Sequence, residues 1–454
     1  MIIPSYTNFQ MFLRSFNMKQ NTVIPTVISI IISPLCLNTI SSSTENKTGL
    51  QTSNTYCLDS ISRPVIVGAD RLFTEFSHLI NGKKIALVTN HTGRLKNGKH
   101  LADALFEYPD ANLIVLFGMH FNIRTNDYSL HKDEESDTDF ETGLPKHSLY
   151  GTIHKPTAEM LKNVEVIIFD IQEVGARFYE HVNILGFVME AAAENNIEVV
   201  VLDRPNPITG IKMDGFVTDN EFLFTFGAYG KIPVIHGLTM GELARLYNET
   251  GMLRNGVHAK LHVIVMIGWK RSMWFDQTGL EWIKPSPNLL TPESILAYTG
   301  TCLFEGLNIS TGRGTKRPFE YVGAPWINNL KVVSLLNDLG LNGVVFDTIT
   351  FTPVKMPFLS RDPYLVGELC KGIFVNVTDK ESFEPYKAGI SMVWAIYKLH
   401  ADNMEWDYAT MNRLVGTQRL VKMIQNGNHP RDIFSSWEKE LSEFKEISRK
   451  YWIY

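Results

Sequence analysis

The feature of this sequence that most constrains its fold is a series of short apolar runs separated by helical patterns. Each run is rich in β-branched residues and is bounded by polar or turn residues, as is typical of strands buried on both faces. Between the runs, apolar residues recur at helical spacing, for example over Leu101–Glu107 and from Leu185 to Asn195. Strands that alternate with helices predict a parallel sheet covered by helices, an α/β fold. The runs are Ile85–Thr89, Leu113–Phe117, Val164–Phe169 and Val199–Leu202.

The alternation weakens after Asp203-Arg-Pro-Asn-Pro, because two prolines so close together cannot continue a helix or a strand. We therefore expect a parallel-sheet domain over residues 64–215 and a smaller domain of helices and strands over 216–454. Residues 268–326 are rich in Pro, Gly and Trp and are expected to be loops. Other expected elements are a helix that begins at Thr157, a helix over Thr239–Glu249 with a capping box, a strand over His262–Met266, and helices over Trp326–Leu339, Tyr386–His400 and Trp437–Tyr451.

Composition excludes several classes of protein. The chain has 454 residues, 44% of them hydrophobic and 20% charged, which is ordinary for a globular protein of two domains and excludes extensive disorder. Its formal net charge of −5 gives it no general attraction for nucleic acid or for anionic membranes. The 4 cysteines are too few for a disulfide scaffold and form no C-x-x-C pair of the kind found in zinc sites.

The N-terminus resembles an export signal. The segment Val23–Leu37 is apolar and uncharged, but it is too short and too interrupted by proline to form a stable membrane span. We interpret residues 1–40 as a signal peptide whose true start is Met18, and residues 41–63 as a polar linker. A lipoprotein cleavage site before Cys36 is not favoured, because the preceding leucine is larger than the small residue such sites prefer. The chain is therefore expected in the periplasm or outside the cell.

Polar residues follow each predicted strand. In open parallel sheets, ligands bind outside the carboxyl ends of the strands, so these residues are candidates for a binding site. Amides, carboxylates and arginines are groups that hold sugar hydroxyls and acidic sugar substituents. The alternative is that residues after strands only make turns and cap helices. The candidates are Asn90, Arg124, Asp170, Gln172, Glu173, Arg177, Tyr179, Asp203, Arg204 and Asn206.

In the second half of the chain, the segment from Cys302 to Pro318 is the densest in functional residue types. Its glycines, Gly312 and Gly314, would allow the backbone to approach a ligand closely. The basic residues between and after them would attract an anion, and Arg313 could hold a carboxylate with two hydrogen bonds. The alternative is an exposed basic loop without a ligand.

Generic catalytic signatures are absent from the sequence. It contains no G-x-S-x-G, no Walker loop, no H-E-x-x-H and no G-x-G-x-x-G, so the parallel sheet does not indicate a nucleotide site. His120, His181 and His236 could bind a metal, but their spacing matches no metal motif, and a structural role is favoured. Neither a metal nor an organic cofactor is expected.

Many longer stretches, in order from Gly68 to about residue 410, resemble the exo-acting β-N-acetylmuramidases (NamZ-like proteins, formerly a domain of unknown function). They are Thr89-Asn-His-Thr-Gly, Thr142-Gly-Leu-Pro, Ser148-Leu-Tyr-Gly, Phe169-Asp-Ile-Gln-Glu-Val-Gly-Ala-Arg-Phe-Tyr, Leu202-Asp-Arg-Pro-Asn-Pro, His236-Gly-Leu-Thr-Met-Gly-Glu-Leu-Ala, Trp274-Phe-Asp, Pro285-Ser-Pro-Asn, Phe304-Glu-Gly-Leu-Asn-Ile-Ser, Gly312-Arg-Gly-Thr, Arg317-Pro-Phe-Glu and Gly323-Ala-Pro-Trp.

The resemblance implies a fold and an activity. The family's secreted bacterial enzymes release N-acetylmuramic acid from the non-reducing ends of peptidoglycan fragments. Their Rossmann-like domain is followed by a smaller α/β domain, and the active site lies in the cleft between the two. The implied partner is thus a peptidoglycan-derived saccharide, with Arg124, Arg177 and Arg313 near its acidic lactyl group. The implied substrate-binding residues are Asn90, Arg124, Gln172, Arg177, Tyr179, Arg204, Asn206, His236, Asn288, Asn308, Ser310 and Arg313.

One departure from the family affects the catalytic residues. Where the family carries Ser-Pro-Glu-His-Gly before Ile-Arg, this chain has Gly118-Met-His-Phe-Asn, which puts His120 at the position of the proposed catalytic glutamate. Glycoside hydrolysis ordinarily needs a carboxylic acid and a second carboxylate. Three readings remain open: an active glycosidase, a catalytically impaired homologue that binds a muropeptide or related amino sugar, and an enzyme of altered chemistry. The candidate catalytic residues are His120, Asp170, Glu173, Asp203 and Glu305.

Overall fold

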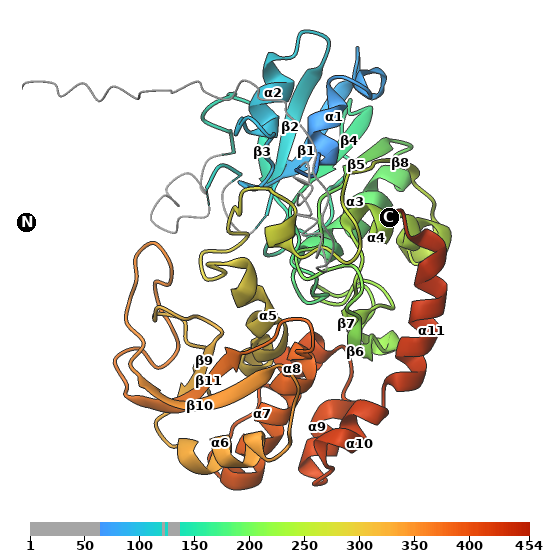
Figure 1. Ribbon diagram of the computed structural model, residues 1–454. Coiled ribbons are helices and arrows are strands. Elements are labelled where there is room, and N and C mark those ends of the chain that lie inside the picture. Colours follow the sequence, from blue (N-terminus) through green and yellow to red (C-terminus); the bar gives the residue numbers. More distant parts are fainter. Residues whose placement is uncertain (1–63, 120–122, 126–136) are drawn as a thin grey trace, which may run out of the picture. The chain divides into compact units, whose positions relative to one another are not determined.

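The structure is a computed structural model that describes residues 64–119, 123–125 and 137–454 (Figure 1). Its N-terminal half is built on a six-stranded sheet in which every neighbouring pair of strands is parallel. The strand order is β3-β2-β1-β4-β5-β8. The strands are β1 (Lys84–Thr89), β2 (Asn112–Gly118), β3 (Lys146–Ser148), β4 (Val166–Asp170), β5 (Glu198–Leu202) and β8 (Lys260–Ile264).

The sheet is buried on both faces, as the uninterrupted apolar runs predicted. Successive residues of β1 point to opposite faces, so that Ile85 and Leu87 join one apolar cluster while Ala86 and Val88 join another. The first cluster includes residues of two helices, α1 (Gly68–Leu72) and α2 (Leu101–Glu107). The second includes residues of α3 (His181–Glu194) and α4 (Met240–Glu249). Helices therefore cover both faces of the sheet, the doubly wound arrangement called Rossmann-like.

The strand order also locates the place where a ligand would bind. Chain order runs outward from β1 in one direction through β2 and β3, and in the other direction through β4, β5 and β8. The loops after β1 and β4 consequently leave the sheet toward opposite faces and open a crevice at the carboxyl ends of these two strands.

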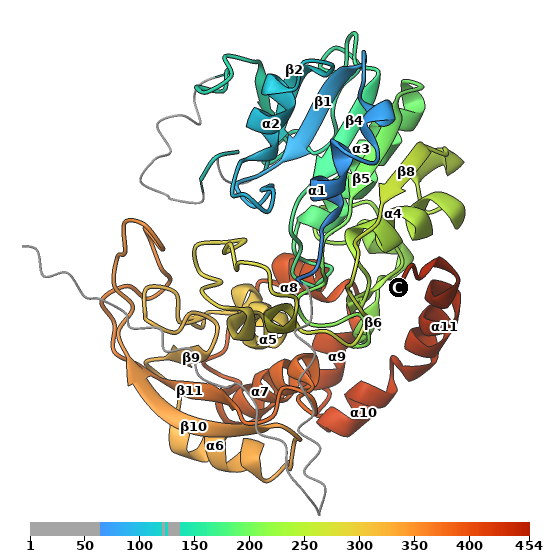
Figure 2. The same ribbon diagram turned by 45° about the horizontal axis from the view of Figure 1, so that its top comes forward.

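The C-terminal part contains an antiparallel sheet with the order β10-β11-β9 and a set of helices. Figures 1 and 2 both show α5 between this sheet and the parallel sheet. The helices α5 and α7 pack closely, because a Cβ atom on Gly300 would stand 2.0 Å from the carbonyl oxygen of Pro385. The elements are β9 (Tyr321–Ala324), β10 (Val344–Phe351), β11 (Cys370–Val377), α5 (Pro292–Thr301), α6 (Asn329–Asn337), α7 (Pro385–His400), α8 (Tyr408–Val415), α9 (Arg419–Gln425), α10 (Pro430–Ser435) and α11 (Glu438–Ser448).

A two-stranded antiparallel sheet of β6 (Asp214–Val217) and β7 (Pro233–Ile235) follows β5 along the chain. The expected domain boundary near residue 215 falls in this small sheet, and the chain then returns to the parallel sheet through α4 and β8. None of the helices in the described ranges has both the length and the hydrophobicity that a membrane span requires.

Most of the expected elements are present, and two expectations about local structure are wrong. Residues 268–326 are not loops throughout, because α5 begins at Pro292 after Thr291, whose side chain forms a capping box with Ser294. The segment from Thr157 forms turns rather than a helix, and Asn163 ends it in the left-handed region with φ of 66°. The capping box of Thr239 and Glu242 is confirmed. The antiparallel sheet β9–β11 was not predicted.

Candidate active site

A pocket of about 490 Å³ opens at the carboxyl ends of β1, β2 and β4, where the strand order places the crevice. The parallel-sheet part contributes Asn90 after β1, Met119 after β2 and the segment 178–181 after β4. The volume suits a small ligand such as a sugar or a disaccharide. The remaining lining residues are Tyr150, Gly151, His154, Phe226, Ser286, Asn288, Leu289, Tyr298, Cys302, Glu305, Arg313, Phe319, Arg413 and Leu414.

Glu180 is the first of two carboxylates in this pocket. It precedes the first turn of α3, and its side chain is half-buried. No residue that the structure describes donates a hydrogen bond to its carboxylate, and its side chain does not cap the helix. Burial raises the pKa of Glu180 to about 8; the charge of Arg413 opposes this shift and the charge of Glu305 adds to it. A large fraction of this carboxyl is therefore protonated at neutral pH.

Glu305, the second carboxylate, has a different environment. It lies in the 3-10 helix η6 (Cys302–Gly306), and its Oε1 is 2.5 Å from Nη2 of Arg313. Burial by itself lowers the pKa of Arg313, but the charge and hydrogen bond of Glu305, together with the other acidic groups nearby, make the net shift upward. The guanidinium also lies 4.7 Å from the ring centre of Phe319. Among the described residues, Glu305 is thus ion-paired, whereas Glu180 is not.

Arg413, on α8, adds a second positive charge to the pocket. Its Nη1 donates a hydrogen bond of 3.4 Å to the carbonyl oxygen of Phe226, and it makes no ion pair with any described residue. Its charge is thus available to an anionic ligand. Together, Arg313 and Arg413 could neutralise an acidic substituent.

The other walls are aromatic and amide groups held by hydrogen bonds. The Tyr179 hydroxyl donates to the Pro285 carbonyl oxygen over 2.9 Å, and the His181 Nδ1 lies 2.9 Å from the Gln172 carbonyl oxygen. His154 stacks on Phe226 with ring centres 4.2 Å apart. The Tyr179 and His181 contacts fix the segment that carries Glu180.

Five of the residues expected from the sequence meet in this pocket, although they are far apart along the chain. The loops after strands and the motif-bearing loops of the second half each supply some of them. The side chain of Asn288 donates through Nδ2 to Leu359 over 2.9 Å, while its Oδ1 has no partner in the described part of the chain. The five residues are Asn90, Tyr179, Asn288, Glu305 and Arg313.

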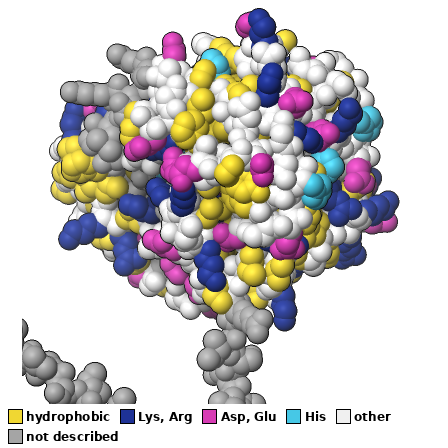
Figure 3. Space-filling view, turned by 90° about the horizontal axis from the view of Figure 1, so that it is seen from above, with side chains coloured by type: hydrophobic (Ala, Val, Ile, Leu, Met, Phe, Trp, Pro, Cys, Tyr) yellow, Lys and Arg dark blue, Asp and Glu magenta, His cyan; other side chains and the backbone are white. Residues whose placement is uncertain are grey.

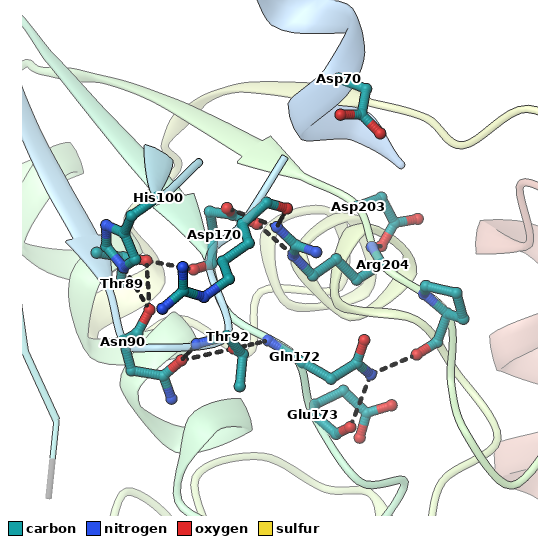
Figure 4. A network of polar contacts seen from close by, with 12 residues as sticks. Asp70, Thr89, Asn90, Thr92, His100, Asp170, Gln172, Glu173, Asp203 and Arg204 are labelled. Atoms are coloured by element: carbon teal, nitrogen blue, oxygen red, sulfur yellow. Dashed lines mark hydrogen bonds and ion pairs between the residues drawn. The ribbon is translucent and has the colours of Figure 1, made fainter. Parts of the chain in front are cut away.

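Several expected residues instead form a buried network beside the pocket, shown in Figure 4. Arg204 holds Asp170 with two hydrogen bonds, of 2.5 and 2.8 Å, and both side chains are buried. The Gln172 amide donates to the carbonyl oxygens of Glu173 and Pro205. None of these residues lines the pocket, because their polar groups satisfy the loops that follow the strands.

Asp203 also serves the fold. Its carboxylate accepts hydrogen bonds from the Thr239 hydroxyl, the Gly241 amide and the Tyr454 hydroxyl, at 2.8, 2.8 and 2.7 Å. The side chain is fully buried and does not line the pocket. Asp203 therefore joins the start of α4 to the last residues of the chain.

Two of the three arginines expected near the acidic group of the ligand lie elsewhere. Arg177 is fully buried and donates to Thr218 and to the carbonyl oxygen of Leu414, while Arg124 pairs with Asp103 and Asp139. Other expected residues bind backbone or are buried: Asn206 donates to Leu238, His236 accepts from Leu238, Asn308 donates to Asn403, and Ser310 accepts from Gly312.

The glycines of the basic loop have a structural role. A Cβ atom on Gly312 would stand 2.6 Å from the Tyr321 carbonyl oxygen, and one on Gly314 would stand 2.5 Å from that of Val354. They bring backbone close to backbone, and neither lines the pocket. His120 and its neighbours Phe121 and Asn122 lie outside the described residues.

Sequence reasoning missed Glu180 and Arg413. Glu180 directly follows the motif that ends at Tyr179, so that motif indicated the position of Glu180 but not its role. Arg413 had no sequence signal, since its helix was not predicted. Within the described ranges, no group of three or more His, Cys, Asp or Glu side chains is arranged to hold a metal ion.

The protein has a doubly wound sheet, a polar pocket at the topological switch point of that sheet, and an α+β part that completes the pocket. These features define its class of protein: an α/β protein that binds a small polar ligand at the carboxyl edge of its sheet. The chain belongs to the NamZ exo-β-N-acetylmuramidase family, whose N-terminal model matches residues 85–293 and whose C-terminal model matches residues 296–454.

Individual relatives agree with this assignment. The chain is 41% identical over 391 residues to the peptidoglycan β-N-acetylmuramidase NamZ of Bacillus subtilis (strain 168), a match that covers 86% of this chain and 91% of the relative. Crystal structures of two DUF1343 family proteins from Bacteroides fragilis NCTC 9343 are similar to it, with TM-scores of 0.79 and 0.70 at 33% and 30% identity. Each match covers 86% of this chain and 99% of the other.

Proposed function

We propose that this protein is a glycoside hydrolase that releases N-acetylmuramic acid from the non-reducing ends of peptidoglycan fragments. Membership of the family supports the reaction type, and the Bacillus subtilis relative is a peptidoglycan β-N-acetylmuramidase. The observation that carries the proposal is the pocket, which combines two carboxylates, Glu180 and Glu305, with two guanidinium groups, Arg313 and Arg413.

This combination matches the chemistry of the substrate. Glycoside hydrolysis uses a pair of carboxyl groups on either side of the scissile bond, and both are present in one pocket here. N-acetylmuramic acid carries a lactyl carboxylate that N-acetylglucosamine lacks. A guanidinium binds a carboxylate with short, charge-assisted hydrogen bonds, so Arg413 suits an acidic amino sugar.

His120, at the position of the family's glutamate, is proposed to act in the same reaction. A histidine can donate a proton near neutral pH, but it cannot easily replace a carboxylate that stabilises an oxocarbenium ion. We also propose that the protein acts after export, a prediction that rests on the apolar segment Val23–Leu37. His120 and the segment Val23–Leu37 both lie outside the described part of the chain.

A product assay on defined disaccharides tests the function. Residues 41–454 should release N-acetylmuramic acid from the β-1,4-linked disaccharide of N-acetylmuramic acid and N-acetylglucosamine, and should leave N,N′-diacetylchitobiose intact. Chromatography of the products measures both reactions. Calorimetric binding of the first disaccharide without any release would favour the impaired, binding-only homologue. Release that His120→Ala leaves unchanged would remove His120 from the catalytic group.

A further inference from the structure

Glu180 is held in the pocket by contacts that do not use its carboxylate. Its backbone carbonyl oxygen accepts hydrogen bonds from the amides of Asn183 and Ile184, which completes the first turn of α3. On its N-terminal side, the Tyr179 hydroxyl is bonded to Pro285, and on its C-terminal side, the His181 ring is bonded to Gln172. The fold therefore fixes the backbone on both sides of Glu180 and leaves its carboxyl group facing the pocket.

The Glu180 side chain, which directly precedes the first turn of α3, makes no hydrogen bond to the start of that helix. Nor does Glu180 form an ion pair with any residue in the described ranges, whereas Glu190, farther along α3, pairs with Lys155. A half-buried carboxyl group without a structural partner reduces stability unless it stays protonated. Stability alone thus does not account for a glutamate at this position.

The two carboxyl groups of the pocket differ in their neighbours. Glu305 has a guanidinium at 2.5 Å, while Glu180 has a neighbouring negative charge from Glu305 and only partial compensation from Arg413. Burial raises the pKa of Glu180 to about 8. When two titratable groups in one site have environments that move their pKa values apart, one usually acts as the acid and the other as the base. The titratable and charged groups around Glu180 in the pocket are Tyr150, His154, Tyr179, His181, Tyr298, Cys302, Glu305, Arg313 and Arg413.

We propose that Glu180 is the general acid of the reaction and that Glu305, held by Arg313, is the second carboxylate, beside the anomeric carbon. This inference rests on the proposed function and assigns its catalytic groups. As the glycosidic C–O bond breaks, the leaving oxygen takes the proton of Glu180. A water molecule supplies the hydroxyl group on the anomeric carbon, and its remaining proton restores a carboxyl group in the pocket, so one water is consumed for each bond broken.

The test compares Glu180→Gln with Glu305→Gln on two substrates. One is the N-acetylmuramic acid–N-acetylglucosamine disaccharide, whose leaving oxygen needs a proton. The other is 4-nitrophenyl β-N-acetylmuraminide, whose leaving group needs none. Glu180→Gln should lower kcat/KM on the disaccharide by about 10²–10⁴-fold and on the nitrophenyl substrate far less. Glu305→Gln should impair both substrates alike. Glu249→Gln, an exposed substitution on α4, is the matched control.

The pH profile gives a second readout. Glu180 can donate a proton only while it is protonated, so kcat/KM of the parent should fall as pH rises through about 8. This basic limb should disappear in Glu180→Gln. Because glutamine also removes the burial penalty of a charged group, its unfolding temperature at pH 8 should not fall below that of the parent. If this variant folds poorly, Glu180→Asp should retain the basic limb with a reduced rate.

Failure of the Glu180 role can be distinguished from failure of the proposed function. Suppose that the parent protein turns over both substrates, and that Glu180→Gln retains the basic limb and loses equal activity on both substrates. The role of Glu180 is then refuted while the proposed function stands. If the parent releases no N-acetylmuramic acid from either substrate, the proposed function fails, and the role of Glu180 fails with it.

Discussion

Among single residues, Arg413 best explains how the pocket could select an acidic sugar. Arg313 is already engaged with Glu305 at 2.5 Å, whereas Arg413 has only a 3.4 Å hydrogen bond to a carbonyl oxygen. The arginines favoured from the sequence, Arg124 and Arg177, are bound in other parts of the fold. Side-chain type therefore predicted the chemistry of recognition, but not which arginines provide it.

Arg413→Ala is expected to weaken binding of N-acetylmuramic acid by about 10–100-fold, because a hydrogen bond to a charged group contributes roughly 1.5–3 kcal/mol. Affinity for N-acetylglucosamine, which has no lactyl carboxylate, should change little. Isothermal calorimetry with both sugars measures the difference. Arg245→Ala, on the exposed side of α4, is the control. An equal loss for the two sugars would contradict a role in selecting the acidic group.

The N-termini of two helices show how a local sequence pattern combines with a tertiary hydrogen bond. Both α4 and α5 begin with a threonine that caps the helix, Thr239 and Thr291. The first also donates its hydroxyl to the buried carboxylate of Asp203 at 2.8 Å, and the second bonds only within its own cap. The sequence pattern is the same type in both, so only the fold distinguishes their contributions.

Thr291→Ala is expected to lower the free energy of unfolding by about 1 kcal/mol, the usual effect of losing a cap. Thr239→Ala should lower it by about 2–4 kcal/mol, because Asp203 also loses a buried donor. Urea unfolding followed by circular dichroism measures both variants, with Thr→Ser at each site as the control that keeps the hydroxyl. Equal effects at the two sites would show that the bond to Asp203 does not stabilise the protein.

At the scale of the whole molecule, the last residues of the chain form hydrogen bonds to the parallel-sheet part. The Tyr454 hydroxyl donates to Asp203 and accepts from the Met266 amide, both within 2.8 Å. The Arg271 guanidinium lies 3.9 Å from the ring centre of Trp452. In Figure 1 the C-terminal end of the chain indeed lies near α4, at the end of α11. The C-terminal part is thereby tied to the sheet that carries half of the pocket.

Tyr454→Phe is expected to lower the free energy of unfolding by about 2 kcal/mol, because it removes a donor to a buried carboxylate. Tyr451→Phe, whose hydroxyl makes no hydrogen bond with any described residue, should have little effect. Thermal and urea unfolding of both variants measure the difference. If the two substitutions behave alike, the terminal contact with Asp203 is not stabilising.

Surface charge gives the molecule little general attraction for an anionic sugar. Figure 3 shows one face on which basic and acidic side chains are interspersed, and the formal net charge is −5. Attraction of the ligand must then arise from the local guanidinium groups of the pocket.

The sequence by itself determined the parallel sheet, most of its strands and helices, and the family, because apolar periodicity, caps and contiguous motifs are local properties. It also marked Asn90, Glu305 and Arg313, which lie in such motifs. Only the tertiary structure decided which polar residues share a pocket. Asp170 and Asp203 end adjacent strands yet satisfy buried groups, whereas Glu180 and Arg413 meet although they are far apart in the chain. A side chain's hydrogen-bond partners and its burial, which decide whether it stabilises the fold or faces a ligand, come from chain segments that no local pattern specifies.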